Sequence, residues 1–264
     1  MDTDAQLTER DRSPEPHEGR EQGSRSARFP GLSPRGAWRW LTGGGALRRT
    51  GVLLATCIVL ILVVSGFVLQ PFLIPSGSME NTLHVGDRVL VNKLAYRFGD
   101  EPRRGDVVVF DGTDSFLQNA PSENAVAGLV RRVGSAVGLM EPADTDYIKR
   151  VVGVGGDHVT CCDKRGRLMV NGRPITEKYL YPGDAPSTVS FDVVVPDGKL
   201  WVMGDHRGAS RDSRDHLGEP GGGTVPVDRV IGRADWIGWP FGRMTSLKRP
   251  GGFADVPEPG GAHG

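Results

Sequence analysis

The sequence predicts an all-β domain that is preceded by one transmembrane helix and a disordered N-terminal tail. The prediction depends on a polar, Arg-rich start, on one uninterrupted apolar block at residues 51–70, and on short strand-like runs from residue 71 onward. A chain of 264 residues can hold one substantial domain with appendages. Its 38 glycines and 19 prolines suit turns around a strand-rich core.

The first 50 residues are rich in Arg, Gly, Pro and Ser and lack aliphatic runs. They cannot bury enough apolar area to offset the entropy of ordering, so we expect a disordered tail.

Residues 51–70, GVLLATCIVLILVVSGFVLQ, carry no charge and have the length that a helix needs to cross a bilayer. A cleavable signal peptide would be shorter and closer to residue 1, and a soluble core helix would carry a polar face. Arginines are the only charged residues between positions 25 and 50. Because Arg-rich short flanks stay in the cytoplasm, we expect a single-pass protein of the cell membrane with an extracytoplasmic C-terminal domain.

The β-rich domain is expected over residues 71–249. Its strand-like runs are rich in Val and aromatic residues and are separated by turn signals. They are residues 87–96, 105–110, 147–154, 158–162, 167–172, 188–195, 199–204 and 229–238. Residues 126–140 instead show apolar side chains at helical spacing, which predicts an amphipathic helix. Residues 250–264 are rich in Gly and Pro and are expected to form a flexible tail.

Charge and cysteine content restrict the partners. Basic and acidic residues number 32 each, so the chain lacks the basic excess of a nucleic-acid-binding protein. Cys57, Cys161 and Cys162 form no disulfide framework, and their spacing fits no metal site. An oxidising compartment would permit a bond between Cys161 and Cys162, but two adjacent strand residues on opposite faces are the favoured interpretation. We expect no cofactor, no metal and a monomer.

Two elements carry candidate chemistry. Ser76 and Ser78 flank a glycine just after the apolar block, where an ordinary turn is the simpler interpretation. Lys149 lies in a strand-like run and shares its face with Tyr147 and Val151. An amine beside apolar neighbours loses hydration, which lowers its pKa and allows it to act as a general base toward a serine.

A third element, residues 203–214 (MGDHRGASRDSR), packs charges of both signs after an apolar strand. It is either an exposed ion network of little consequence for stability or a loop that positions a catalytic group. In this order, after one span, four segments resemble the motifs of type I signal peptidases. They are residues 75–83, 103–110, 146–157 and 203–214.

The resemblance covers about residues 70–240, and its specificity comes from four short motifs in the right order. It implies an antiparallel β-sheet catalytic domain in a membrane-bound serine endopeptidase. Such an enzyme would remove signal peptides from exported preproteins after small residues, at A-x-A-like sites. Its partners would be signal peptides and the lipid bilayer.

The resemblance also implies a role for each matching residue. Ser78 would be the nucleophile, Lys149 the general base and Ser76 an oxyanion-hole donor. Ser210 would hydrogen-bond Lys149 and orient it. Supporting ion pairs would come from Asp212, Arg214, Arg150 and Asp205. Candidates for the substrate pocket are Ile74, Met79, Leu83, Tyr147 and Ile148.

Three positions depart from the family pattern: Asn81, where proline is frequent, His206, where Asn is common, and Gly208, where an acid is common. His206 also raises the alternative of a triad with Ser78 and Asp205. We disfavour that triad because adjacent residues on extended backbone point to opposite faces.

Two further alternatives stay open at this point. Trp236, Trp239 and Phe241 would form either part of the core or an aromatic rim at the bilayer surface. A membrane-tethered β-domain that only binds partners would explain the span and the strands, but not the Ser and Lys motifs.

Overall fold

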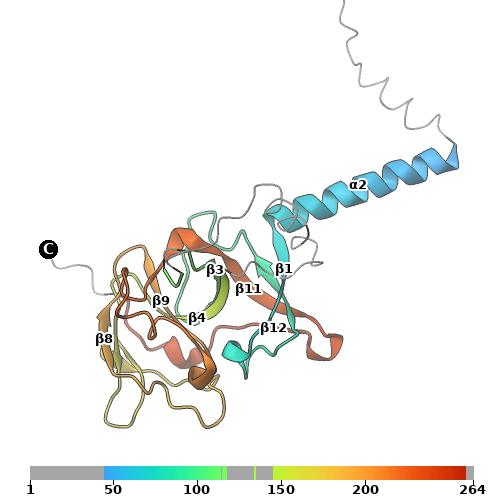
Figure 1. The fold of residues 1–264 in the computed structure, drawn as a ribbon. Helices are drawn as coiled ribbons and strands as arrows, with labels where there is room; N and C mark the ends of the chain where they lie inside the picture. The colour runs from blue at the N-terminus through green and yellow to red at the C-terminus, as the bar shows by residue number, and fades with distance from the viewer. Residues whose placement is uncertain (1–44, 114, 118–133, 135–144, 260–264) are drawn as a thin grey trace, which may run out of the picture. The chain divides into compact units, whose positions relative to one another are not determined.

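The structure is a computed structural model that describes residues 45–113, 115–117, 134 and 145–259 (Figure 1). Residues 1–44 of the expected tail lie outside the described residues, as does nearly all of the helix expected over 126–140.

The apolar block forms the helix α2, Ala46–Phe67, whose apolar side chains are exposed along its length. By length and composition it is the one described helix that could cross a membrane. It begins before the predicted start at residue 51 and ends before residue 70, because Leu69 and Gln70 pair with Asn92 and Val91 instead. The expected tail is therefore helical over its last residues, from Ala46.

Five of the eight strand-like runs contribute strands to an eight-stranded sheet in which every pairing is antiparallel. Its order is β1-β2-β11-β3-β4-β9-β10, with β12 paired to β11. The strands are β1 (Leu69–Leu73), β2 (Arg88–Asn92), β3 (Val107–Asp111), β4 (Asp146–Val154), β9 (Lys199–Met203), β10 (Val225–Pro226), β11 (Val230–Trp239) and β12 (Thr245–Ser246). The expected antiparallel β-fold is confirmed.

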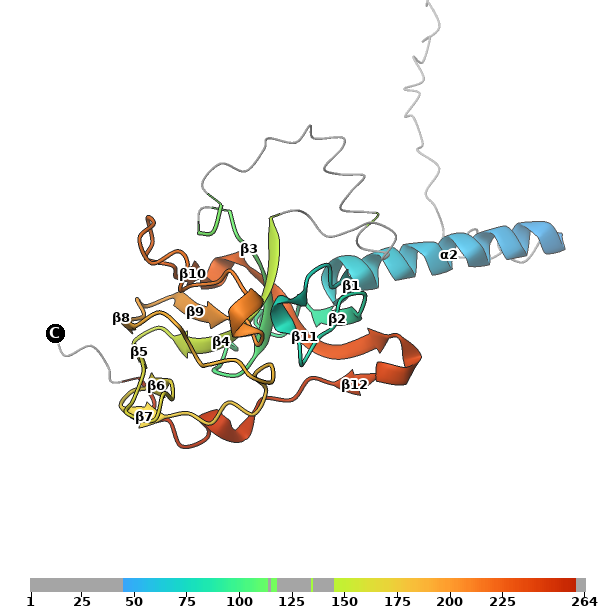
Figure 2. The same ribbon diagram turned by 60° about the horizontal axis from the view of Figure 1, so that its bottom comes forward.

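A second antiparallel sheet has the order β7-β6-β5-β8 (Figure 2). Its strands are β5 (His158–Cys161), β6 (Met169–Val170), β7 (Arg173–Pro174) and β8 (Phe191–Val194). Apolar residues from both sheets share one buried cluster, in which Trp201 of β9 packs against Phe191 of β8 with ring centroids 5.2 Å apart. Burial of large aromatic side chains of this kind dominates the energetics of such a core.

Short 3₁₀ turns lie between the strands and carry several residues of the candidate site. They are η1 (Gly77–Met79), η2 (Arg207–Ala209), η3 (Val227–Arg229), η4 (Phe241–Arg243) and η5 (Gly251–Phe253). The turn η1 follows β1, and η2 follows β9, so each turn comes after a strand of the large sheet.

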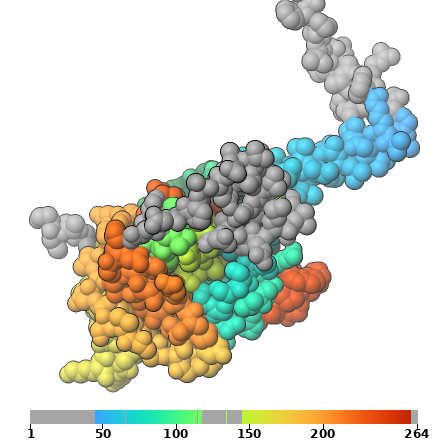
Figure 3. Space-filling view, viewed as in Figure 1, coloured from blue at the N-terminus to red at the C-terminus, as the bar shows by residue number. Residues whose placement is uncertain are grey.

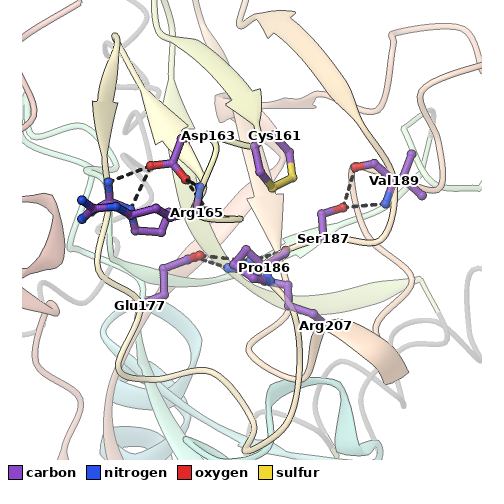
Figure 4. The surroundings of a disulfide bond; sticks show 10 residues. Cys161, Asp163, Arg165, Glu177, Pro186, Ser187, Val189 and Arg207 are labelled. Atoms are coloured by element: carbon purple, nitrogen blue, oxygen red, sulfur yellow. Dashed lines mark hydrogen bonds and ion pairs between the residues drawn. A yellow bond between two sulfur atoms is a disulfide. The ribbon is translucent and has the colours of Figure 1, made fainter.

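Cys161 and Cys162 form a disulfide, contrary to the favoured sequence interpretation (Figure 4). The interpretation failed because β5 ends at Cys161. Cys162 therefore does not continue the strand, and alternation between the two faces of a sheet does not separate the two side chains.

The C-terminal segment is also better ordered than expected. Phe253 and Val256 are buried, and the Phe253 ring stacks on Tyr179 with centroids 6.4 Å apart. Arg104 donates to the carbonyls of Val256 and Pro257. Two buried apolar side chains and these hydrogen bonds dock the segment up to residue 259, despite its Gly and Pro content.

The aromatic residues near the end of β11 are not core. Trp236 and Trp239 are each 47% exposed and Phe241 is 72% exposed. Trp239 and Phe241 contact one another edge-to-face, and Met244 beside them is also exposed. These four residues, which we call the aromatic hairpin, form an exposed apolar group where β11 turns back toward β12.

Candidate active site

Ser78 and Lys149 come from distant parts of the chain and meet inside the domain. Ser78 lies in η1 and is 6% exposed, and Lys149 lies in β4 and is 4% exposed. The Lys149 Nζ atom is 2.8 Å from the Ser78 Oγ atom, which is hydrogen-bond distance. A hydroxyl is thus in direct contact with a buried amine.

The environment of Lys149 disfavours its charged form. In β4, Lys149 stands opposite Val108 of β3, and it shares a face with Val151, which is fully buried. Burial lowers the pKa of Lys149 from 10.5 to about 8, against the opposing charges of Asp212 and Asp205. Desolvation is therefore the dominant cause, and the neutral amine is far more populated near neutral pH than in an exposed lysine.

Arg150, the next residue of β4, pairs with Asp205. Its Nε and Nη2 atoms donate to the two carboxylate oxygens of Asp205 over 2.8 and 2.6 Å, and Nη1 donates to the Gly105 carbonyl. The hydroxyl of Thr82 also donates to Asp205. Both members of the pair are almost fully buried, so their charges are compensated within the protein.

Asp212 and Arg214 form a second buried pair. Arg214 donates from Nε and Nη2 to the two oxygens of Asp212 over 2.8 and 2.9 Å, and the Gly204 amide donates to the same carboxylate. Burial would raise the pKa of Asp212, but the hydrogen bonds and charge of Arg214 outweigh it, and the pKa lies below its usual value. Asp212 is therefore ionised, and Arg214 offsets the pull of its charge on Lys149.

The other two candidate serines differ in exposure and in hydrogen bonding. Ser76 is exposed, and its hydroxyl donates to Ser78 Oγ over a long 3.4 Å. Ser210 is buried, and its hydroxyl makes no hydrogen bond of ordinary geometry with any described residue. It lies near enough to Asp212 to contribute to that carboxyl's low pKa, so the expected hydrogen bond from Ser210 to Lys149 is not formed.

The five candidates for the substrate pocket lie next to the pair but are mostly packed into the core. Four belong to one buried cluster, in which Met79 and Leu83 are fully inaccessible. The four are Ile74, Met79, Leu83 and Ile148. Tyr147 packs at the edge of a neighbouring cluster and is half-buried.

His206 is close to Ser78 without forming the alternative triad. Its backbone N–H donates to the Ser78 carbonyl, but no hydrogen bond among the described residues joins its ring to Ser78 or Asp205. The Asp205 carboxylate is occupied by Arg150 and Thr82. In Figure 3 the teal segment that carries Ser78 adjoins the orange segment that follows β9.

Sequence reasoning missed several buried residues that support these pairs. Tyr179 places its ring 4.3 Å from the Arg150 guanidinium carbon, and its hydroxyl donates to Glu177. Glu177 pairs in turn with Arg207. No local pattern marks Glu177 or Tyr179, because the arginines that they contact are distant in sequence. In the part of the chain that the structure describes, no group of His, Cys, Asp and Glu is arranged to hold a metal ion.

Comparison with known proteins identifies the class of protein. Residues 47–239 match the family described as signal peptidase, peptidase S26. A signal peptidase I of Mycobacterium tuberculosis is 42% identical over 224 residues, which cover 76% of each chain. A relative from Mycobacterium leprae is 42% identical over 231 residues, covering 76% of this chain and 79% of the relative.

More distant bacteria give matches of the same kind. A signal peptidase I of Leptolyngbya laminosa is 35% identical over 193 residues, covering 73% of this chain and 80% of the relative. The family match spans most of the chain and includes Ser78, Lys149 and the loop of Asp205 to Arg214. The chain therefore belongs to the signal peptidase family, and the resemblance seen in the sequence is confirmed.

Proposed function

We propose that this chain is a signal peptidase of type I, a serine endopeptidase in which Ser78 is the nucleophile and Lys149 the general base. The observation that supports this proposal most directly is the 2.8 Å contact between Lys149 Nζ and Ser78 Oγ, away from water and with a depressed lysine pKa. A neutral amine at this distance can accept the serine proton.

Each step follows from these positions. Lys149 removes the Ser78 proton as Oγ attacks the carbonyl carbon of the scissile peptide bond. The tetrahedral intermediate expels the amine of the mature protein, which receives the proton from Lys149. A water molecule activated by Lys149 then hydrolyses the ester on Ser78 and releases the signal peptide.

The developing oxyanion needs hydrogen-bond donors. The Ser78 backbone N–H and the Ser76 hydroxyl are the proposed donors, and one such donor contributes about 3–4 kcal/mol to transition-state stabilisation in other serine proteases. Ser76 is exposed, so its hydroxyl is free to turn from Ser78 toward a bound carbonyl.

The substrate is a preprotein with small residues at the first and third positions before the cut. Such a peptide would bind in extended form, with backbone hydrogen bonds to a strand edge and alternate side chains in shallow pockets. The buried cluster that contains Ile74 and Ile148 would form the pocket floor, and its close packing excludes larger side chains.

The protein is proposed to sit in the cell membrane through α2, with its N-terminus in the cytoplasm and its catalytic domain outside. The Arg-rich flank before α2 supports this orientation. The aromatic hairpin supports a resting position at the bilayer surface, because exposed Trp and Phe side chains favour that interface.

The test is cleavage of a secretory preprotein with an A-x-A site by the full chain in detergent. Wild type is expected to trim the signal peptide, while Ser78→Ala and Lys149→Ala fold normally and do not. Equal cutting by Lys149→Ala would exclude it as the base. No cutting by wild type would favour a binding domain without enzymatic activity.

A further inference from the structure

The ring of His206 is held on two sides. The ring of Tyr181 stacks on it with centroids 3.9 Å apart and an interplanar angle of 12°. On another side, Glu80 Oε2 lies 3.6 Å from His206 Nδ1, a nitrogen that is buried and makes no hydrogen bond among the described residues. The side chain of His206 is only 20% exposed, so this arrangement is more than a loose surface contact.

These three residues belong to three segments that are far apart in sequence. Glu80 closes the nucleophile turn, since its N–H donates to the Gly77 carbonyl over 3.0 Å. His206 precedes η2, and its N–H donates to the Ser78 carbonyl over 3.1 Å. Tyr181 lies between β7 and β8, and its N–H donates to the Asp205 carbonyl over 3.0 Å.

The nucleophile turn has no side-chain cap at its N-terminal end, and a neighbouring loop packs against it. Ser76 makes no side-chain capping bond to η1. The loop that starts at Gly204 instead lies directly against Ser78, and a Cβ at Gly204 would be 2.5 Å from the Ser78 carbonyl oxygen. The placement of the Ser78 backbone is therefore set by the loop that contains His206.

That loop is held in turn by residues 181–186. The Asp184 carboxylate accepts a hydrogen bond of 3.0 Å from the Gly208 amide. Gly208 stands where an acidic residue is common in the family, and here Asp184 places a carboxylate beside that position. Figure 4 shows Arg207 between Glu177 and the carbonyl of Pro186.

We propose that Tyr181, His206 and Glu80 form a clasp that positions the Ser78 turn against Lys149, with Tyr181 and His206 as positioning residues. The inference rests on the proposed function of Ser78 as nucleophile. The clasp acts through the backbone of Ser78 and touches neither the Ser78 hydroxyl nor the Lys149 amine. The clasp keeps the Ser78 Oγ atom at reacting distance from the Lys149 amine. A displacement of about 1 Å at a reacting group can lower a rate about 100-fold.

The experiment measures the steady-state kcat and KM for cleavage of an A-x-A preprotein by the full chain in detergent. Tyr181→Ala and His206→Ala are expected to lower kcat about 10-fold with KM within about twofold, because ground-state binding is unaffected. His206→Phe and Tyr181→Phe keep two stacked rings and are expected to restore kcat to within about threefold of wild type. The double alanine variant should lose no more than the worse single variant, since both break one contact.

Three results would overturn the clasp. A wild-type kcat in Tyr181→Ala would show that the stacking of Tyr181 on His206 does not contribute to catalysis. Complete loss in both His206→Ala and His206→Phe would make His206 a proton carrier. A raised KM with unchanged kcat would make these residues substrate contacts.

A second readout separates the clasp from the function. Hydrogen exchange of the peptide that contains residues 77–83 should quicken in both alanine variants and recover in His206→Phe. If wild type cuts no preprotein while the exchange pattern is seen, the proposed function fails and the clasp stands. If wild type cuts and the exchange is unchanged in every variant, the clasp fails and the function stands.

Discussion

The lysine of the site and the aromatic hairpin depart from ordinary protein surfaces and interiors in opposite ways. Lys149 places an ionisable amine in the interior of the domain, with only 4% of its surface exposed. The aromatic hairpin puts Trp239 and Phe241 into solvent. Buried polar groups and contiguous exposed apolar groups are the informative exceptions to normal burial.

The difference lies in what each region needs from its surroundings. The low-dielectric interior makes Lys149 useful, because desolvation lowers its pKa to about 8 and so makes the neutral amine far more populated near neutral pH than in an exposed lysine. The hairpin would gain from surroundings that the isolated domain lacks, namely lipid. The environment that Lys149 needs is therefore supplied by the fold, whereas the proposed partner of the hairpin lies outside it.

The largest effect should follow from keeping the shape of Lys149 while removing its chemistry. Lys149→Arg stays charged at all accessible pH values, and Lys149→Met stays neutral but cannot accept a proton. Both should lower kcat by about 10²–10⁴-fold, measured as preprotein cleavage. Near-normal cleavage by either variant would show that the buried amine is not the base.

The second effect concerns the arginine that compensates Asp212. Arg214→Met leaves a buried carboxylate unpaired, which should destabilise the fold by about 3–5 kcal/mol in denaturant unfolding. It should also raise the pKa of Lys149, because Arg214 lowers that pKa and an unpaired Asp212 raises it. The acid limb of the rate profile should then move to higher pH. A shift to lower pH would contradict this electrostatic account, and exposed Arg211→Met is a matched control.

The third effect is a pH dependence of stability. Because folding lowers the pKa of Lys149 from 10.5 to about 8, the unfolded state binds more protons between those values. Stability from this group therefore falls as pH falls through that window, by about 3 kcal/mol in total. As pH falls through this window, the unfolding free energy of Lys149→Met should therefore rise relative to that of the wild type by the same amount. A difference that does not vary with pH would mean that Lys149 keeps its ordinary pKa when folded.

The smallest effect concerns the hairpin. With the full chain in vesicles of brominated lipid and Trp38 and Trp40 replaced by Phe, Trp236 and Trp239 should be quenched by a modest fraction. Trp201 is fully buried and serves as an internal control. Replacing Trp236 and Trp239 by Phe should abolish the quenching. Equal quenching without them would remove the hairpin from the membrane surface.

Most of the fold was predictable because its strands have strong local patterns. The run of Val107 to Phe110 and the run around Lys149 are apolar enough to mark β3 and β4. By contrast, β10 and β12 have only two residues each, and β1 contains Pro71, which is tolerated there because β1 is an edge strand. Phe253 and Val256 were missed because their partners are distant in sequence and the Gly-rich context hides them.

The residues of the candidate site likewise divide into those that the sequence predicts and those that it does not. Ser78, Lys149 and the ion-pair residues lie in motifs that a single sequence can display. The contacts of Thr82, Tyr179 and Glu177 exist only after folding, and each is made with residues far along the chain. The hydrogen bond expected from Ser210 to Lys149 is missing for a similar reason, since side-chain direction within a loop is not set by motif order.

The disulfide between Cys161 and Cys162 also affects how the chain can be labelled. The sequence has three cysteines, and Cys57, the third, lies within α2. With the pair oxidised, the chain presents no native thiol outside the apolar helix to a charged maleimide. A single cysteine introduced at exposed Ser246, or in the segment before Ala46, would therefore report its side of the membrane on a naturally silent background.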